Sequence, residues 1–109
     1  ICCFSHSGTT AQLAARERPR VPIIALTPFN RTARRLTLIW GLHCSVVEEV
    51  ERFKLAVVSA ARVAKRDGFA AETDRIVVTA GVPFGQPGTT NILRVALADE
   101  RAIYEGEPA

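Results

Sequence analysis

The sequence predicts an α/β domain with a layered α/β/α arrangement, in which helices cover a mostly parallel sheet of about five strands and the last two strands are antiparallel. Three observations support this fold class. Short apolar runs alternate with amphipathic stretches, no helical stretch separates the last two runs, and a hydroxyl-rich loop follows the first run. With 109 residues, 48% of them hydrophobic, the chain has the size of a single domain.

Five apolar runs have the composition of strands. Ile1–Phe4 and Val21–Thr27 are almost continuously apolar, as expected for strands that are covered on both faces. His43–Val47 is a shorter candidate. Arg75–Ala80 and Ile92–Ala98 flank a loop rich in glycine and proline, so they pair most simply as antiparallel neighbours.

Three stretches between these runs predict helices. Residues 11–17 contain good helix formers, and residues 32–40 place Ala33, Leu36 and Trp40 at helical spacing between a candidate N-cap, Asn30, and a stop at Gly41. The longest apolar periodicity runs from Val50 and ends at Gly68. Trp40 is expected in the core or at an interface. The domain is expected to cover residues 1–98, and residues 99–109 to form a solvated acidic tail.

The loop after the first strand has the composition of a phosphate site. Its residues are small hydroxyl donors around a glycine and a histidine: Ser5, His6, Ser7, Gly8, Thr9 and Thr10. A helix that begins at Ser7 or Gly8 adds backbone N–H groups and the positive end of its dipole. His6 either donates to the phosphate or is a plain exposed loop residue. No lysine follows the glycine and no GxGxxG is present, so the loop is neither a Walker A motif nor a dinucleotide fingerprint.

A second loop, residues 81–90, follows the fourth strand and is expected at the same edge of the sheet. Its glycines and hydroxyls are candidate ligand contacts, namely Gly81, Gly85, Gly88 and Thr89; the alternative is that they only shape a tight connection. Arg34 and Arg35 on the second helix could face an anion, a partner subunit or water. Solvation or an intersubunit salt bridge is the preferred interpretation of that pair.

Composition excludes several other functions. Cys2 and Cys3 are adjacent on a strand and point to opposite faces, so buried reduced thiols are expected, and no cluster of metal ligands or catalytic triad can be recognised. The net charge is +3, with six arginines in residues 1–40, which suits a small anionic ligand. Stacking aromatics for nucleic acid and a run long enough to cross a membrane are both missing. We therefore expect a non-catalytic, cytoplasmic domain that holds no metal or cofactor.

Several segments in this order and spacing resemble the C-terminal domain of pyruvate kinase, of the bacterial type. The resemblance covers roughly residues 1–97, and it rests on the following segments: Phe4-Ser5-His6-Ser7-Gly8-Thr9-Thr10-Ala11, Arg18 to Pro28, Ala33-Arg34-Arg35-Leu36 with Trp40-Gly41, Asp74 to Gly81, and Gly88-Thr89-Thr90-Asn91. The family's domain usually starts with a helix before the first strand, and that helix is missing here.

The resemblance implies an enzyme of glycolysis that transfers phosphate from phosphoenolpyruvate to ADP with Mg²⁺ and usually K⁺, in a catalytic barrel domain outside this segment. It also implies a regulatory domain of a homotetramer, in which the first loop binds the phosphate of a sugar or nucleotide effector and the loop 81–88 closes over the ligand. Animal-type relatives place a tryptophan and an arginine for a second phosphate between Glu48 and Val58, and this sequence has no tryptophan there. A monophosphate such as ribose 5-phosphate, glucose 6-phosphate or AMP is therefore comparable in plausibility to fructose 1,6-bisphosphate.

Two alternatives come from other classes of protein. The pattern Ser5-x-Ser7-Gly8-x-Thr10 after an apolar strand is also similar to the phosphate loop of sugar-phosphate isomerase domains. In a purely structural assembly module, by contrast, the same loop would bind nothing.

Overall fold

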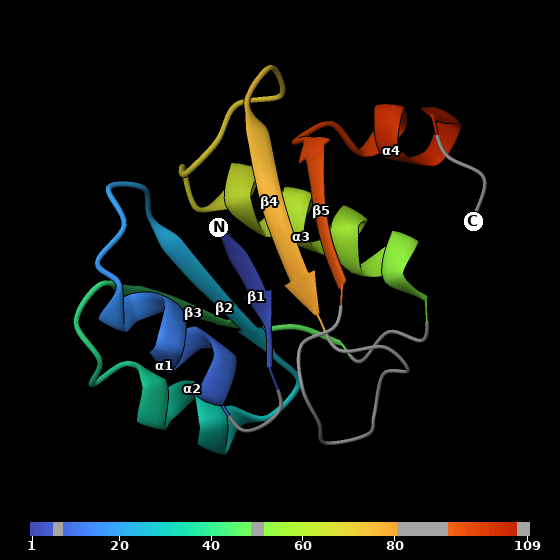
Figure 1. Ribbon diagram of the computed structural model, residues 1–109. Coiled ribbons are helices and arrows are strands. Elements are labelled where there is room, and N and C mark those ends of the chain that lie inside the picture. Colours follow the sequence, from blue (N-terminus) through green and yellow to red (C-terminus); the bar gives the residue numbers. More distant parts are fainter. Residues whose placement is uncertain (6–7, 49–51, 81–91, 107–109) are drawn as a thin grey trace.

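Five strands form one sheet in the computed structural model, which describes residues 1–5, 8–48, 52–80 and 92–106 (Figure 1). The sheet has the order β3-β2-β1-β4-β5, with β4 and β5 antiparallel and the other neighbours parallel. The strands are β1 Cys2–Phe4, β2 Ile23–Thr27, β3 Leu42–Val46, β4 Arg75–Ala80 and β5 Ile92–Leu97. The helices are α1 Thr9–Arg16, α2 Asn30–Leu36, α3 Phe53–Arg66 and α4 Glu100–Gly106. The predicted fold class is thus confirmed.

The sheet separates two cores. On one face, α1 and α2 pack against β1, β2 and β3; on the other, α3 packs against the centre of the sheet, and α4 packs against α3 and the edge strand β5 (Figure 1). The adjacent cysteines show the division, since Cys2 belongs to the core under α3 and Cys3 to the core under α1 and α2. Both thiols are buried and free, as predicted. Burial raises the pKa of Cys2 to about 11 and also raises the pKa of Cys3.

The second helix is shorter than predicted. α2 ends at Leu36, and the backbone then tightens, because Leu38 and Ile39 donate to carbonyls three residues before them instead of four. Leu36 is fully buried, whereas Trp40 is 73% exposed. Of the two expected places for Trp40, the core of this domain is therefore excluded, and the interface stays a prediction. Gly41 has a left-handed backbone, with φ +88°, but it lies beyond the C-cap Thr37, so it does not end α2 as predicted.

The segment expected as a solvated acidic tail contains a helix. The Asp99 carboxylate accepts a hydrogen bond from the Arg101 N–H at 3.1 Å, which is the geometry of an N-cap, and α4 follows. Ile103 is buried against α3, and the Arg62 guanidinium donates to Glu100 at 2.8 and 3.0 Å. The acidic composition concealed this helix, because only one large apolar side chain anchors its described part.

A polar network ties β3 to the end of α3. His43 Nε2 and Asp67 Oδ2 are 2.8 Å apart, and Arg66 donates to Asp67 Oδ1 at 3.0 Å and to Ser45 Oγ at 3.1 Å. The hydrogen bonds from Arg66 and then His43 lower the pKa of Asp67. The network therefore links β3, the edge strand of the sheet, to the C-terminal end of α3.

One face of β5 stays uncovered. Leu93, Val95 and Leu97 alternate along the strand and are exposed, because α1 and α2 cover the same side of the sheet only as far as β1.

The expected absence of the family's usual first helix concerns a segment outside this sequence, and it stays a prediction.

Candidate functional site

The parallel strands end at a common edge of the sheet, which we call the carboxyl edge. It is formed by the last residues of β1 to β4, namely Phe4, Thr27, Val46 and Ala80. Parallel α/β sheets bind ligands outside this edge, since the loops and helix amino ends that follow the strands meet there. The hydroxyl-rich loop begins at this edge, directly after Phe4.

Ser5 anchors the loop at both its backbone and its side chain. Its N–H donates to the Leu26 carbonyl at 3.0 Å, which extends the pairing of β1 with β2. Its hydroxyl oxygen accepts a hydrogen bond from the Gly8 N–H at 2.8 Å, which draws the two ends of the turn together. A hydroxyl that accepts one bond still has its own proton to donate, so this geometry is compatible with an anion beside Ser5.

Gly8 is the N-cap of α1, and its conformation requires glycine. Its φ is +91°, and a Cβ at this position would lie 2.8 Å from Leu36 Cδ2 and 3.2 Å from Leu36 Cγ. The loop can therefore approach α2 this closely only without a side chain at position 8. The first hydrogen bond of the helix runs from the Gln12 N–H to the Gly8 carbonyl at 3.0 Å.

The amino end of α1 has an electrostatic character that favours an anion. Its first turn, which contains Thr9 and Thr10, has no acidic residue, so no carboxylate of that turn compensates the positive end of the helix dipole. A guanidinium nitrogen of Arg35, on α2, would lie 3.3 Å from a Cβ at Gly8. Arg35 thus reaches the turn that opens α1, which the sequence did not reveal because Arg34 and Arg35 are indistinguishable there.

A second helix amino end belongs to the same edge. α3 follows β3, starts after its N-cap Arg52, and likewise has no acidic residue in its first turn. Lys54 also lies in that turn. This is the segment between Glu48 and Val58 in which the sequence offered no tryptophan for a second phosphate.

Four of the ten predicted ligand residues lie in the described part of the chain: Ser5, Gly8, Thr9 and Thr10. The others lie outside the described residues; they are His6, Ser7, Gly81, Gly85, Gly88 and Thr89. The ends of the second loop are nevertheless placed. β4 is the direct neighbour of β1, and Ala80 pairs with Ile92, so both attachment points of residues 81–91 lie at the carboxyl edge.

Two further findings concern the described residues. No three histidine, cysteine or acidic side chains in the described ranges come together as ligands of a metal ion. Within the same ranges, no helix is long and apolar enough to cross a membrane.

Fold and edge together define a class: an open, three-layer α/β domain with a glycine-capped helix amino end and a basic side chain at the carboxyl edge of its sheet. The family model described as the pyruvate kinase α/β domain matches residues 1–96. The chain belongs to this family.

Relatives and solved structures agree with the assignment. The pyruvate kinase of Methylorubrum extorquens is 46% identical over 96 residues, which cover 88% of this chain and 20% of that protein. A pyruvate kinase of Agrobacterium vitis is 44% identical over 98 residues, covering 90% of this chain and 21% of that protein. A structure of Cryptosporidium parvum pyruvate kinase in complex with ADP has a TM-score of 0.78 at 26% identity, covering 90% of this chain and 20% of that one.

The chain thus spans about a fifth of the length of these relatives, and it matches their C-terminal part. Membership of this family sets aside the sugar-phosphate isomerase alternative.

Proposed function

We propose that this domain binds a phosphorylated effector at its carboxyl edge and regulates the parent pyruvate kinase allosterically. The observation that carries the proposal is the turn at Gly8. It brings together the Ser5 hydroxyl, a helix amino end whose first turn has no acidic residue, and the Arg35 guanidinium. The ligand class is a phosphorylated sugar or a nucleoside monophosphate.

The parent enzyme would transfer phosphate from phosphoenolpyruvate to ADP, using Mg²⁺ and K⁺ bound in a catalytic barrel domain outside this segment, and would assemble as a homotetramer. An effector changes such an enzyme only by binding one of its states more tightly than another, with a coupling of typically 1–3 kcal/mol. This segment alone is expected to be inactive, and turnover of phosphoenolpyruvate by it would contradict that expectation.

Isothermal titration calorimetry tests the effector site. Ribose 5-phosphate, glucose 6-phosphate, fructose 1,6-bisphosphate and AMP are titrated separately, with inorganic phosphate as the control for a non-specific anion site. Binding of one organic phosphate, without comparable binding of inorganic phosphate, is the expected result. Absence of binding throughout would instead favour the structural assembly module.

Two substitutions then locate the phosphate. Arg35→Gln should weaken the binding about tenfold, since it removes a charge-assisted hydrogen bond, whereas Arg34→Gln should not. The two arginines are adjacent and both exposed, so the pair controls for net charge. Thr10→Val should also weaken binding, by leaving a phosphate oxygen unpaired. Equal affinities of the two arginine variants would remove Arg35 from the site, and unchanged affinity of the Thr10 variant would remove Thr10.

A further inference from the structure

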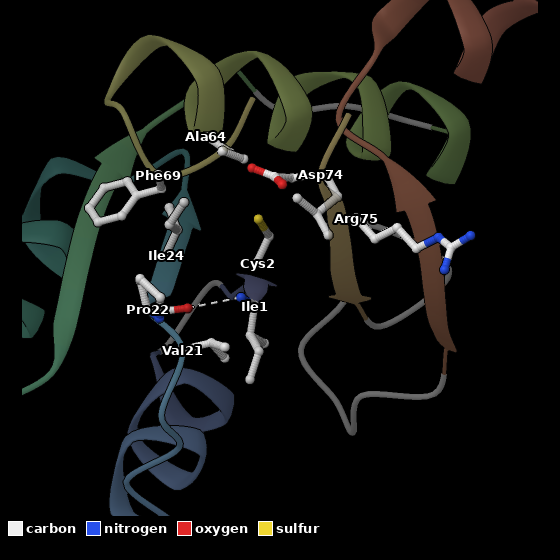
Figure 2. Close-up of a pocket in the computed structure, with 11 residues that line it drawn as sticks. Ile1, Cys2, Val21, Pro22, Ile24, Ala64, Phe69, Asp74 and Arg75 are labelled. Carbon is white, nitrogen blue, oxygen red and sulfur yellow. Dashed lines mark hydrogen bonds between the residues drawn. The ribbon is translucent and has the colours of Figure 1, made fainter. Parts of the chain in front are cut away.

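Pockets open on two sides of α3 in the described part of the chain. One of them, with a volume of about 210 Å³, lies beside the start of β1 (Figure 2). Its polar groups are used within the domain, since the Ile1 nitrogen donates to the Pro22 carbonyl at 2.9 Å and Asp74 accepts from the Ala71 N–H at 2.8 Å. Figure 2 also shows the Arg75 guanidinium directed away from it. The other pocket is larger and more polar, so it is the better candidate for a binding site.

The larger pocket is a groove between α3 and the chain that leaves β3, and we call it the α3 groove. Its volume is about 380 Å³, which exceeds the volume of about 150 Å³ of an apolar cavity that binds benzene. Residues 46–48 form one wall, and the buried side chains of Val58 and Val63 contribute to the lining. The other wall consists of residues that share one face of the helix: Leu55, Ser59, Arg62 and Arg66. The groove is therefore apolar toward the start of α3 and basic toward its end.

β3, which borders the groove, has an unpaired edge, because it is the last strand on its side of the sheet. The Val47 N–H donates to the Thr27 carbonyl at 3.0 Å. The backbone groups of successive strand residues point in alternate directions, so the N–H and C=O groups of Cys44 and Val46 point away from β2. The strand also contains no lysine or proline, with which many edge strands prevent further pairing. This edge can therefore accept an extended segment as an additional strand.

Charge indicates what kind of segment fits. α3 contains four basic residues and no acidic one, and two of the four, Arg62 and Arg66, line the groove. Each of these arginines also contacts one carboxylate of the domain, Glu100 or Asp67, but both side chains remain exposed. Their hydrogen bonds with the described residues use Nε and Nη2, so the Nη1 of each keeps N–H groups for a second acceptor. A carboxylate of the incoming segment therefore fits beside these arginines.

The groove also determines how far this carboxylate lies from an apolar side chain. Arg66 bonds to Ser45 at 3.1 Å, whereas Glu48 lies farther along the chain, so this acidic residue of the lining lies toward the start of α3. At about 1.5 Å per residue, Leu55 lies about 10 Å from Arg62 and about 16 Å from Arg66 along the helix axis. A strand rises about 3.3 Å per residue and shows the same face at every second residue, so residues four positions apart span about 13 Å on one face.

We propose that the α3 groove and the free edge of β3 bind an extended acidic segment of a partner protein, which adds a strand to the sheet. An apolar side chain of the segment lies beside Leu55, and a carboxylate four positions away lies between Arg62 and Arg66. This inference goes beyond the effector proposal and uses none of the predicted ligand residues, so either can fail without the other.

Fluorescence anisotropy of labelled synthetic peptides tests the proposal with the full-length protein. The probes are short threonine-rich peptides with a leucine and a glutamate four positions apart, in both orders, since a strand can add to the edge in either direction. At least one order should bind. The same peptide with the two residues three positions apart should bind about fivefold more weakly, because they then lie on opposite faces of the strand. Absence of binding, or equal affinity at both spacings, overturns the proposal.

Methylation of the peptide backbone tests the strand pairing itself. A strand pairs with its neighbour through alternate residues, so N-methylation of one alternate set of residues should abolish binding, whereas N-methylation of the other set should not. Equal effects of the two sets overturn the added strand. Binding that appears only when the protein is diluted to monomers also overturns the proposal, because a second copy is then the occupant of the edge.

Two variants of the full-length protein test the basic wall. Arg62→Gln and Lys65→Gln each remove one positive charge from α3, and both residues contact Glu100, at 2.8 and 3.7 Å, but only Arg62 lines the groove. Arg62→Gln should weaken the binding of the peptide about fivefold and Lys65→Gln less than about twofold. Replacing the glutamate of the peptide with glutamine should weaken binding to the original protein but not to the Arg62 variant. Equal losses for the two variants contradict the proposed site.

Discussion

Replacing Gly8 with alanine tests the close contact that shapes the candidate phosphate loop. The left-handed backbone, φ +91°, costs an alanine about 1–2 kcal/mol. The new Cβ would also lie 2.8 Å from Leu36 Cδ2, so the Leu36 side chain would have to shift, and because it is fully buried it can shift only against its neighbours in the core. Overpacking of this kind typically costs a further 1–3 kcal/mol. The expected loss in the free energy of unfolding is therefore about 2–5 kcal/mol.

Gly41→Ala is the matched control. Its φ is +88°, but, apart from its chain neighbours, no atom of the described residues lies within 4 Å of the position of its Cβ, so only the backbone cost of about 1–2 kcal/mol remains. Urea unfolding of the 109-residue chain, followed by far-ultraviolet circular dichroism, compares the two variants. A loss for Gly8→Ala that is no greater than that for Gly41→Ala would refute the close contact between the loop and α2.

Two further predictions concern α2 and the network at the end of α3. Leu36→Ala should lower the free energy of unfolding by about 2–5 kcal/mol, because Leu36 is fully buried. Leu38→Ala should change it by less than about 0.5 kcal/mol, because Leu38 is exposed. Similar losses for the two variants in urea unfolding would contradict the conclusion that the buried face of α2 ends at Leu36. Asp67→Asn should destabilise the chain above pH of about 4, since the pKa of Asp67 is lowered in the folded state and its contribution disappears as the pH falls through that pKa. The free energy of unfolding of the original chain and of the Asp67→Asn variant, measured from acid to neutral pH, checks this. A difference between the two proteins that is the same at every pH would contradict the prediction.

The strands were the part of the fold that local sequence described best. The apolar run Arg75–Ala80 is a strand with those bounds, and its antiparallel pairing with Ile92–Leu97 is confirmed. Such runs are predictable because a strand buried in a sheet needs apolar or β-branched residues along its own length. The end of α2 was not predictable, since the helical spacing of Leu36 and Trp40 continues through a turn whose backbone has already tightened.

In the candidate site, too, some features could be predicted from the sequence and others could not. The sequence indicated the hydroxyl loop, and the structure adds the bond from the Gly8 N–H to Ser5 Oγ that closes it. Arg35 was not distinguishable from Arg34, because which of two adjacent arginines reaches the loop depends on how α2 packs against α1. The acidic residues after Asp99 concealed α4 for a related reason, since the anchor of that helix, Ile103, is buried only by contact with α3.

By itself, the sequence determined the alternation of strands and helices, the burial of Cys2 and Cys3 on opposite faces, and the glycine that opens α1. These properties depend on residues near one another in the chain, whose periodicity and backbone preferences are local. Only the tertiary structure decided that Arg35 lies at Gly8, that Trp40 is exposed under Arg18, and that β5 keeps one apolar face uncovered. Each of these depends on the distance between elements that are separate in sequence, and the packing of the whole domain sets that distance.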